Sequence, residues 1–175
     1  MREKMFLVNL RRELRRNRSI RVKVFIAGFR LTNFFFEFDK TRVLYALSNC
    51  IYKTVCFFFK IDILARTRIG WGLRIFHPFC ICIHPDVRIG DDCILRHGVT
   101  LGNKGESSSA VPSVGNGVEF GCYAVVFGGV SIPDGARVRA LSLTTESERS
   151  KVAIDVNVRD ACDLDRESLC GFDRP

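Results

Sequence analysis

The residues of this chain best suited to acid–base chemistry are its three histidines, His77, His84 and His97. Imidazole gains and loses a proton nearer to neutral pH than any other side chain, so it can act as a general base. His84 precedes Pro85 at an expected turn and is predicted to face solvent. His77 is the first candidate for a base and His97 is a candidate substrate contact, with a surface position as the ordinary alternative for both.

Cysteine is the other residue type that could carry chemistry, through disulfides or a metal site. No two of the eight cysteines have CxxC spacing. The Arg-rich start is not followed by an apolar core and a small-residue cleavage site, so we expect no signal peptide. The cysteines are therefore expected to be free, reduced and mostly buried in a cytosolic protein, with no metal site. They are Cys50, Cys56, Cys80, Cys82, Cys93, Cys122, Cys162 and Cys170.

A six-residue repeat that starts at Ile69 indicates how the histidines would be positioned. A period of six is typical of a triangular coil with very short strands as its sides, in which one aliphatic and one small residue of each side point inward. A β-sandwich would show a period of two. The repeat therefore predicts an all-β core in the form of a parallel β-helix of hexapeptide repeats. Its aliphatic register comprises Ile69, Ile75, Ile89, Leu95, Leu101, Val114, Phe120, Val126, Ile132 and Val138, and its second register Val87, Cys93, Val99, Val118, Ala124, Val130, Ala136 and Ser142.

The repeat changes phase twice. It shifts by two residues between Ile75 and Ile83, and an insertion separates Leu101 from Val114. His77 lies in the two-residue expansion, so its side chain can leave the regular coil, and this favours catalysis over a surface role. The Gly and Ser content of the insertion predicts a mobile loop.

The regions on either side of the repeat have a different composition. Residues 1–60 are predicted to be helical, because they contain no proline and only one glycine. The apolar run Val43–Phe59 is interrupted by Lys53 and falls short of the ~20 residues that a membrane span needs, so a packed amphipathic helix is expected. The sequence thus divides into a basic helical segment (1–60), the β-helix (61–144) and an acidic irregular tail (145–175).

Charge is distributed unevenly, although the net charge is +8. Ten of the 27 basic residues lie in positions 1–30, against Glu3 and Glu13, and eight of the 19 acidic residues lie in positions 146–175. A basic head close to phenylalanine clusters at residues 34–38 and 57–59 could mark a membrane-facing surface. Packing of two or three helices on each other and on the next segment is the favoured interpretation of the phenylalanines.

Four runs of the sequence carry a family resemblance. They are Ile69-Gly-Trp-Gly-Leu-Arg-Ile-Phe-His-Pro, Val87-Arg-Ile-Gly-Asp-Asp-Cys, Arg96-His-Gly-Val-Thr-Leu-Gly-Asn and Val114-Gly-Asn-Gly-Val-Glu-Phe-Gly. Over roughly residues 58–139 they resemble the serine acetyltransferase-like branch of hexapeptide-repeat acyltransferases, both phase breaks included. Within that branch the sequence looks most similar to colanic acid and other exopolysaccharide biosynthesis acetyltransferases.

The resemblance implies a left-handed β-helix, acetyl-CoA as co-substrate without a metal, and a homotrimer with the cofactor in a groove between two β-helices. It assigns the family's catalytic histidine to His77 and the carboxylate that orients it to Asp62. His77 would remove the acceptor's hydroxyl proton as the oxygen attacks the thioester, and the carboxylate would stabilise the imidazolium. His97 remains the candidate substrate contact, and the inserted loop would help to wall the active site. The groove would include Gly102, Asn103, Gly121 and Cys122.

The acceptor implied by the resemblance is a sugar hydroxyl in exopolysaccharide biosynthesis. Serine acetyltransferases hold serine with charged residues at positions that read Phe76 and Ala110-Val111 here, which makes serine O-acetylation in cysteine biosynthesis the alternative. A non-catalytic β-helix assembly module is a third hypothesis, because Arg139-Ala-Leu-Ser-Leu replaces the family's closing segment. The protein would be cytoplasmic, with peripheral association at the inner membrane surface through its basic head, and would not bind nucleic acid.

Overall fold

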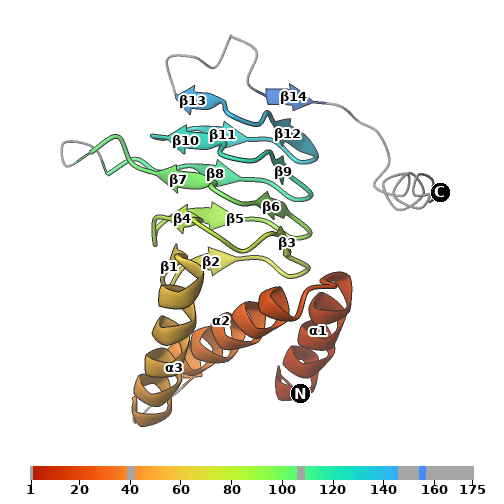
Figure 1. Cartoon of the computed structure of the whole chain (residues 1–175), viewed down its shortest axis with the longest axis vertical. Coiled ribbons are helices and arrows are strands. Elements are labelled where there is room, and N and C mark those ends of the chain that lie inside the picture. The colour runs from red at the N-terminus through yellow and green to blue at the C-terminus, as the bar shows by residue number, and fades with distance from the viewer. Residues whose placement is uncertain (1, 39–41, 106–108, 146–153, 157–175) are drawn as a thin grey trace, which may run out of the picture.

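The computed structural model describes residues 2–38, 42–105, 109–145 and 154–156 as three helices followed by a stack of short strands (Figure 1). The helices are α1 (Arg2–Arg16), α2 (Ile20–Phe38) and α3 (Val43–Phe59). The predicted helical segment is therefore confirmed, and α3 has the predicted bounds. None of the described helices is long and apolar enough to cross a membrane.

The strands form three sheets, in which the pairs are parallel except the last. Sheet A contains β1 (Asp62–Ile63), β4 (Cys82–Ile83), β7 (Thr100–Gly102), β10 (Val125–Phe127) and β13 (Leu143–Thr145). Sheet B contains β2 (Arg68–Ile69), β5 (Arg88–Ile89), β8 (Ser113–Val114) and β11 (Ser131–Ile132). Sheet C contains β3 (Arg74–Phe76), β6 (Ile94–Arg96), β9 (Glu119–Phe120), β12 (Ala136–Val138) and the antiparallel β14 (Ile154–Val156).

Successive strands belong to sheets A, B and C in turn, so each set of three makes one coil of a three-sided parallel β-helix. Inward residues of neighbouring coils pair in register, as Ile69 does with Ile89 and Ile75 with Leu95. The six-residue repeat is therefore confirmed. Its two-residue expansion lies between β3 and β4, and the insertion lies between β7 and β8.

The inward side chains form the core of the β-helix, and every member of the aliphatic register is at most 8% exposed. The second register is buried as well, except for its last predicted member. Ser142 is only half-buried and its hydroxyl donates to the carbonyl of Arg139 at the corner, while Thr144 of β13 is the buried residue.

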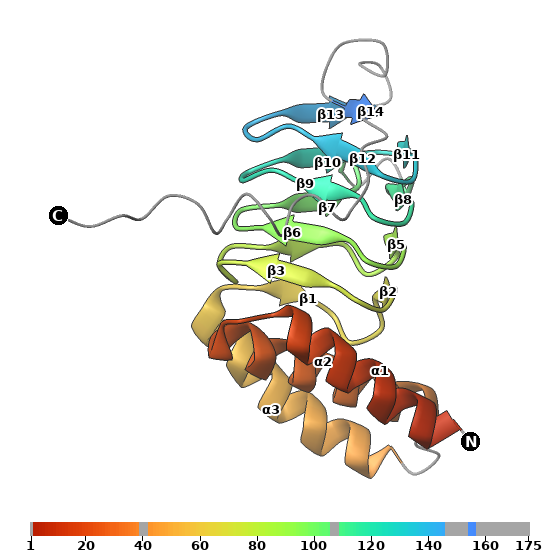
Figure 2. The ribbon, with the colours of Figure 1, turned by 90° about the vertical axis from the view of Figure 1, so that its right-hand side faces the viewer.

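The three helices cover the open end of the first coil (Figure 2). Because this coil has no preceding coil to pair with, its backbone groups need other partners. Asn17, just after α1, donates through Nδ2 to the carbonyl of Leu73 at 2.9 Å and accepts from the amide of Ile75 at 3.0 Å. From α3, the Tyr52 hydroxyl donates to the carbonyl of Ile63 at 2.7 Å. The helical segment is thus a cap of the β-helix rather than an independent unit.

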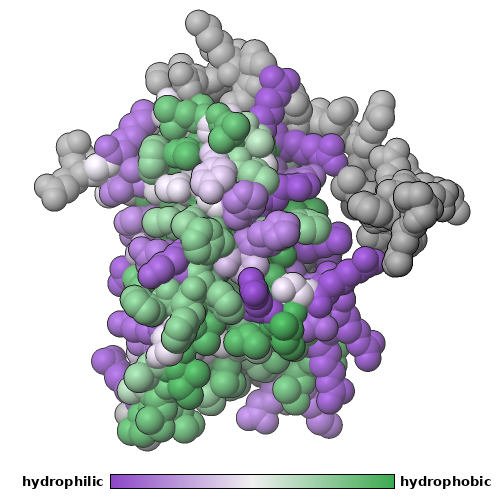
Figure 3. All heavy atoms as spheres, viewed as in Figure 1, coloured by the Kyte–Doolittle hydropathy of each residue, from purple (hydrophilic) through white to green (hydrophobic). Residues whose placement is uncertain are grey.

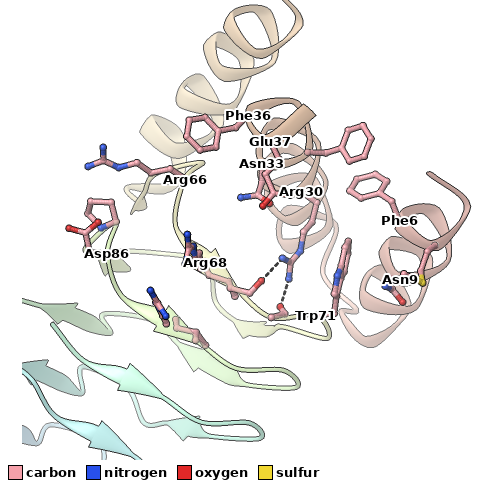
Figure 4. Close-up of a pocket in the computed structure, with 17 residues that line it drawn as sticks. Phe6, Asn9, Arg30, Asn33, Phe36, Glu37, Arg66, Arg68, Trp71 and Asp86 are labelled. Atoms are coloured by element: carbon pink, nitrogen blue, oxygen red, sulfur yellow. Dashed lines mark hydrogen bonds between the residues drawn. The ribbon is translucent and has the colours of Figure 1, made fainter. Parts of the chain in front are cut away.

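A buried ion pair fastens α1 and α2 to the first coil. The side chains of Arg30 and Glu13 are 4% and 0% exposed, and two hydrogen bonds of 2.8 and 2.7 Å join them. Arg30 also donates to the carbonyls of Ile69 and Gly70 (Figure 4), and Glu13 accepts from the amide of Leu73 at 2.8 Å. The ion pair and the additional hydrogen bonds of its two side chains therefore fix the position of both helices on the coil.

Helix packing buries only some of the phenylalanines in the two clusters, whereas the packing interpretation predicts burial for all of them. Phe59 packs against the core and Phe34 is half-buried, in agreement with it. Phe57 and Phe58 are instead 68% and 72% exposed at the C-terminal end of α3. The expectation that they are buried was wrong, because a contiguous run on a helix cannot direct all its members to one face.

The described cysteines are free thiols, but most are not buried as expected. Cys93 lies in the inward register and burial raises the pKa of its thiol to about 11. Cys82 occupies the outward position of β4, and Cys50 and Cys80 are also exposed. Cys162 and Cys170, like most of the acidic tail, lie outside the described residues.

Candidate active site

His77, His97 and Tyr123 form a column of rings at one corner of the β-helix, where the chain passes from sheet C to sheet A. The ring centroids of His77 and His97 are 5.9 Å apart, and those of His97 and Tyr123 are 5.1 Å apart, both edge-on. Nδ1 of His97 is buried and has no hydrogen-bond partner among the described residues. The structure therefore brings the two predicted histidines together, and within the described ranges the buried Nδ1 of His97 stays unpaired beside them.

The backbone of this corner explains the column. His77 and Tyr123 have φ angles of +57° and +55°, a left-handed conformation that costs a residue with a side chain on the order of 1 kcal/mol or more. The amide of Tyr123 donates to the carbonyl of His97 at 3.0 Å, which stacks one turn on the next. A Cβ at Gly98 would lie 2.3 Å from the Tyr123 ring, so only glycine allows Tyr123 to approach His97.

Asp62 begins β1, at the edge of sheet A that faces the same corner, and pairs with Cys82 of the next coil. Burial raises the pKa of the Cys82 thiol, and the negative charge of the Asp62 carboxylate raises it further. Within the described part of the chain, the Asp62 side chain has no hydrogen bond or ion pair with His77. Asp62 thus starts the first coil and His77 directly follows the last strand of that coil, and their pairing stays a prediction.

The four predicted cofactor residues divide between two corners. Gly121 and Cys122 precede β10 at the corner that carries the histidines, whereas Gly102 ends β7 and Asn103 follows it at the opposite edge of sheet A. A Cβ on Gly121 would lie 2.3 Å from the amide nitrogen of Ala140 in the next coil. The packing of the coils therefore already requires glycine at this position. A single chain does not gather the four residues into one groove.

A cavity of about 770 Å³ opens beside His77. Its walls are the turn between α1 and α2, the end of α3, and the chain from β3 through Pro78 and Phe79. Several arginines line it, and none of its lining residues is acidic. The cavity is large enough for a sugar or a similar small molecule to reach the histidine.

A second cavity, of about 1220 Å³, lies between α1, α2 and the first strands of sheet B (Figure 4). Arg30, Phe6 and Trp71 line it, but none of the predicted site residues does. The guanidinium of Arg30 lies 4.4 Å from the centroid of the Trp71 ring. This arrangement is explained by the attachment of the helices to the first coil.

Sequence reasoning missed Tyr123 and the arginines of the α1–α2 turn. Tyr123 could have been found from the coil spacing, because it occupies the turn position that Gly98 holds one coil earlier. The arginines could not, because they come from another part of the chain. In the ranges that the structure describes, no group of three or more His, Cys, Asp or Glu side chains could hold a metal ion.

Comparison with known proteins gives a consistent result, although no protein-family model matches the chain. The chain is 34% identical over 135 residues to the putative colanic acid biosynthesis acetyltransferase WcaB of Escherichia coli K12, which covers 74% of this chain and 83% of that protein. Two solved structures share its fold. They are serine acetyltransferase from Neisseria gonorrhoeae (TM-score 0.67, 21% identity, 81% of this chain) and serine acetyltransferase in complex with coenzyme A from Brucella abortus strain S19 (TM-score 0.58, 23% identity, 69% of this chain). The chain spans 60% and 48% of the lengths of those two proteins.

Proposed function

This chain belongs to the family of hexapeptide-repeat acetyltransferases that includes WcaB and the serine acetyltransferases, and from that premise we propose that it transfers the acetyl group of acetyl-CoA to a hydroxyl. The observation that carries the proposal is the similarity to WcaB over 135 residues, a span that includes most of the β-helix. The paired histidines lie beside an open cavity, which is a site at which acetyl transfer can occur.

His77 is the proposed general base. It takes the proton of the acceptor hydroxyl while the oxygen forms a bond to the thioester carbonyl carbon. The tetrahedral intermediate collapses as the carbon–sulfur bond breaks, and the proton held by His77 passes to the leaving thiolate. Asp62 is the proposed partner that stabilises the imidazolium, and His97 is proposed to contact the acceptor, because its ring lies 5.9 Å from that of His77.

The test is acetyl transfer by His77→Ala, which is expected to lower kcat by about 10²–10⁴-fold. Asp62→Asn should give a smaller loss. His84→Ala is the matched control, because His84 lies at a turn between β4 and β5, away from the column. Circular dichroism checks that each variant is folded. Full activity in His77→Ala would refute the role of His77 and direct attention to His97.

We also propose a left-handed β-helix that assembles as a homotrimer. Exposed apolar side chains gather on sheet A and at both of its edges, and Figure 3 shows hydrophobic residues continuing up this face from α3. They are Leu64, Phe79, Tyr123, Leu141 and Leu143, each between 39% and 83% exposed. A neighbouring copy that covers this face would bring its own Gly102 and Asn103 to the histidine corner, which reunites the divided cofactor residues.

Mixed trimers test this assembly. If the cofactor groove lies between copies, His77→Ala and Asn103→Ala chains, each weakly active alone, should regain activity when they are co-expressed, because some grooves then contain neither substitution. Light scattering should give the mass of three chains. An active monomer, or the absence of any gain in mixtures, would contradict the shared site.

The proposed acceptor is a sugar hydroxyl in exopolysaccharide biosynthesis, as the name of WcaB suggests. Serine is the alternative, since the two solved structures are of serine acetyltransferases. Coenzyme A release measured with L-serine and with a panel of free and phosphorylated sugars separates the two. Faster turnover of serine would overturn the sugar proposal and leave acetyl transfer intact.

We propose that the enzyme is cytoplasmic and that it binds an anionic membrane surface peripherally through α1. Met5, Leu7 and Val8 are 52–64% exposed on this arginine-rich helix. Deletion of residues 1–30 would not test this proposal, because Glu13 and Arg30 hold the first coil. Replacement of the three apolar residues by serine is the better test. It should abolish sedimentation with phosphatidylserine vesicles, and failure of the unmodified protein to sediment at low salt would refute the proposal.

A further inference from the structure

The cavity beside His77 carries an excess of positive charge. Arg16, Arg18, Arg21 and Arg74 line it together with His77, and no aspartate or glutamate does. Arg16 is paired with Asp92 outside the cavity. Arg18 and Arg21 are exposed and have no carboxylate partner within the described ranges. Two guanidinium groups therefore stand at the cavity without a protein counter-charge.

The helix that starts at this cavity adds to the same field. Ser19 directly precedes α2 and Arg21 lies in its first turn, and both line the cavity; this helix of 19 residues has no acidic residue in that turn. The amide of Lys23 is bonded to the carbonyl of Ser19, so the amides before it have no partner within the helix. Partial positive charge at a helix start favours an anion, and the unpaired arginines act in the same direction.

The remaining walls are apolar. Phe58, Phe59, Phe76 and Phe79 line the cavity together with the arginines and His77. Aromatic faces suit the apolar face of a sugar ring, while a phosphate suits the planar donor fork of arginine. The cavity of about 770 Å³ has room for both groups at once.

We infer that this cavity binds the acceptor, and that the acceptor is a sugar phosphate or diphosphate whose charged group is held by Arg18 and Arg21 while its hydroxyl reaches His77. The inference rests on the proposed acetyl transfer and names its acceptor class. The cavity lies on the first-coil side of His77, whereas the proposed coenzyme A residues start at Gly102 of the later coils. The arginines are therefore assigned to the acceptor and not to the phosphates of coenzyme A.

The first experiment measures binding alone, by titration calorimetry with inorganic pyrophosphate. Replacing Arg18 and Arg21 together by alanine should weaken binding by about 10- to 100-fold, as expected for loss of two charge-assisted hydrogen bonds. The matched control replaces Arg11 and Arg15, which are exposed on α1 and do not line the cavity. It removes the same charge and should change binding by less than about 3-fold, because solvent screens exposed charges that make no direct contact with the ligand. Equal losses in both variants, or no binding by the unmodified protein, would overturn the subsite.

The second experiment measures acetyl transfer to a free hexose, to the same hexose linked to a nucleoside diphosphate, and to the same hexose linked to a short polyprenyl diphosphate. Either diphosphate should be preferred over the free hexose, and the better of the two identifies the carrier. In the Arg18→Ala, Arg21→Ala variant, KM for the diphosphate acceptor should rise about 10-fold while KM for acetyl-CoA stays within about 2-fold. A rise in the acetyl-CoA KM instead would assign the arginines to coenzyme A and refute the inference.

The two experiments also separate this inference from the activity on which it rests. If no acceptor is acetylated, the proposed function fails, and the pyrophosphate titration still decides whether the cavity binds an anion. If the free hexose is acetylated as efficiently as its diphosphates, acetyl transfer stands and the acceptor inference fails.

Discussion

Arg30 lies nine residues after Arg21 and twelve after Arg18 in sequence, but its surroundings are the opposite of theirs. Arg30 is buried, and Glu13, two backbone carbonyls and the Trp71 ring surround its guanidinium. Arg18 and Arg21 are exposed at the cavity beside His77, with no carboxylate partner in the described part of the chain. Arginine at the first coil thus stabilises the fold where it is paired and buried, and is available to a ligand where it is not.

The largest effect on stability is expected from breaking the buried pair. Glu13→Ala leaves the Arg30 charge buried without compensation and should lower the free energy of unfolding by about 3–5 kcal/mol. Urea unfolding followed by circular dichroism measures the change. Glu3→Ala, an exposed position on the same helix, is the control and should have almost no effect. Equal midpoints for the two variants would show that the pair does not hold the cap.

A smaller loss is expected from Asn17→Ala. The substitution removes the partners of the Leu73 carbonyl and the Ile75 amide, both buried in the first coil, at a cost of about 1–3 kcal/mol. Because Ile75 lies in β3, immediately before His77, kcat should fall as well. Glu3→Ala, exposed on α1 and outside the cavity beside His77, serves as the control in both measurements. Unchanged stability of Asn17→Ala would mean that water replaces the side chain at the coil edge.

The difference between the arginine groups also explains what the sequence could and could not predict. The β-helix follows from a strict period, so the inward residues, both phase breaks and the exceptional position of His77 were predictable. The cap was not, because Glu13 and Asn17 bond to residues 60 and 58 positions away, and no local pattern encodes which helix side chain meets which backbone group. From the sequence alone, the basic residues in positions 1–30 form one charged patch. That patch includes Arg30, whose charge is neutralised by Glu13, as well as Arg18, whose charge no described carboxylate neutralises.

Arg16 is intermediate between Arg30 and the unpaired arginines, because it is paired but partly exposed. It lines the cavity but is paired with Asp92, and both side chains are partly exposed, 34% and 44%. Solvent screens such a pair, so Arg16→Ala should cost no more than about 1 kcal/mol. The cost should shrink in 1 M sodium chloride, whereas that of Glu13→Ala should not, because salt screens exposed pairs far more than buried ones. An equal salt response in the two variants would remove the distinction between them.

The smallest effect on unfolding is expected from the Arg18→Ala, Arg21→Ala variant. Neither side chain has a carboxylate partner among the described residues and both are exposed, so the free energy of unfolding should change by less than about 0.5 kcal/mol. Removal of two like charges from one turn could even relieve repulsion.

The informative quantity is the response to an anion. A ligand that binds only the folded protein stabilises it by RT ln(1 + [L]/Kd), so pyrophosphate at about ten times its Kd should stabilise the unmodified protein by about 1.4 kcal/mol. The variant should gain much less at the same concentration, while Glu13→Ala, although far less stable, should keep the full gain. A variant that is destabilised without pyrophosphate would instead make Arg18 and Arg21 part of the cap, and the two groups of arginines would then share one structural role.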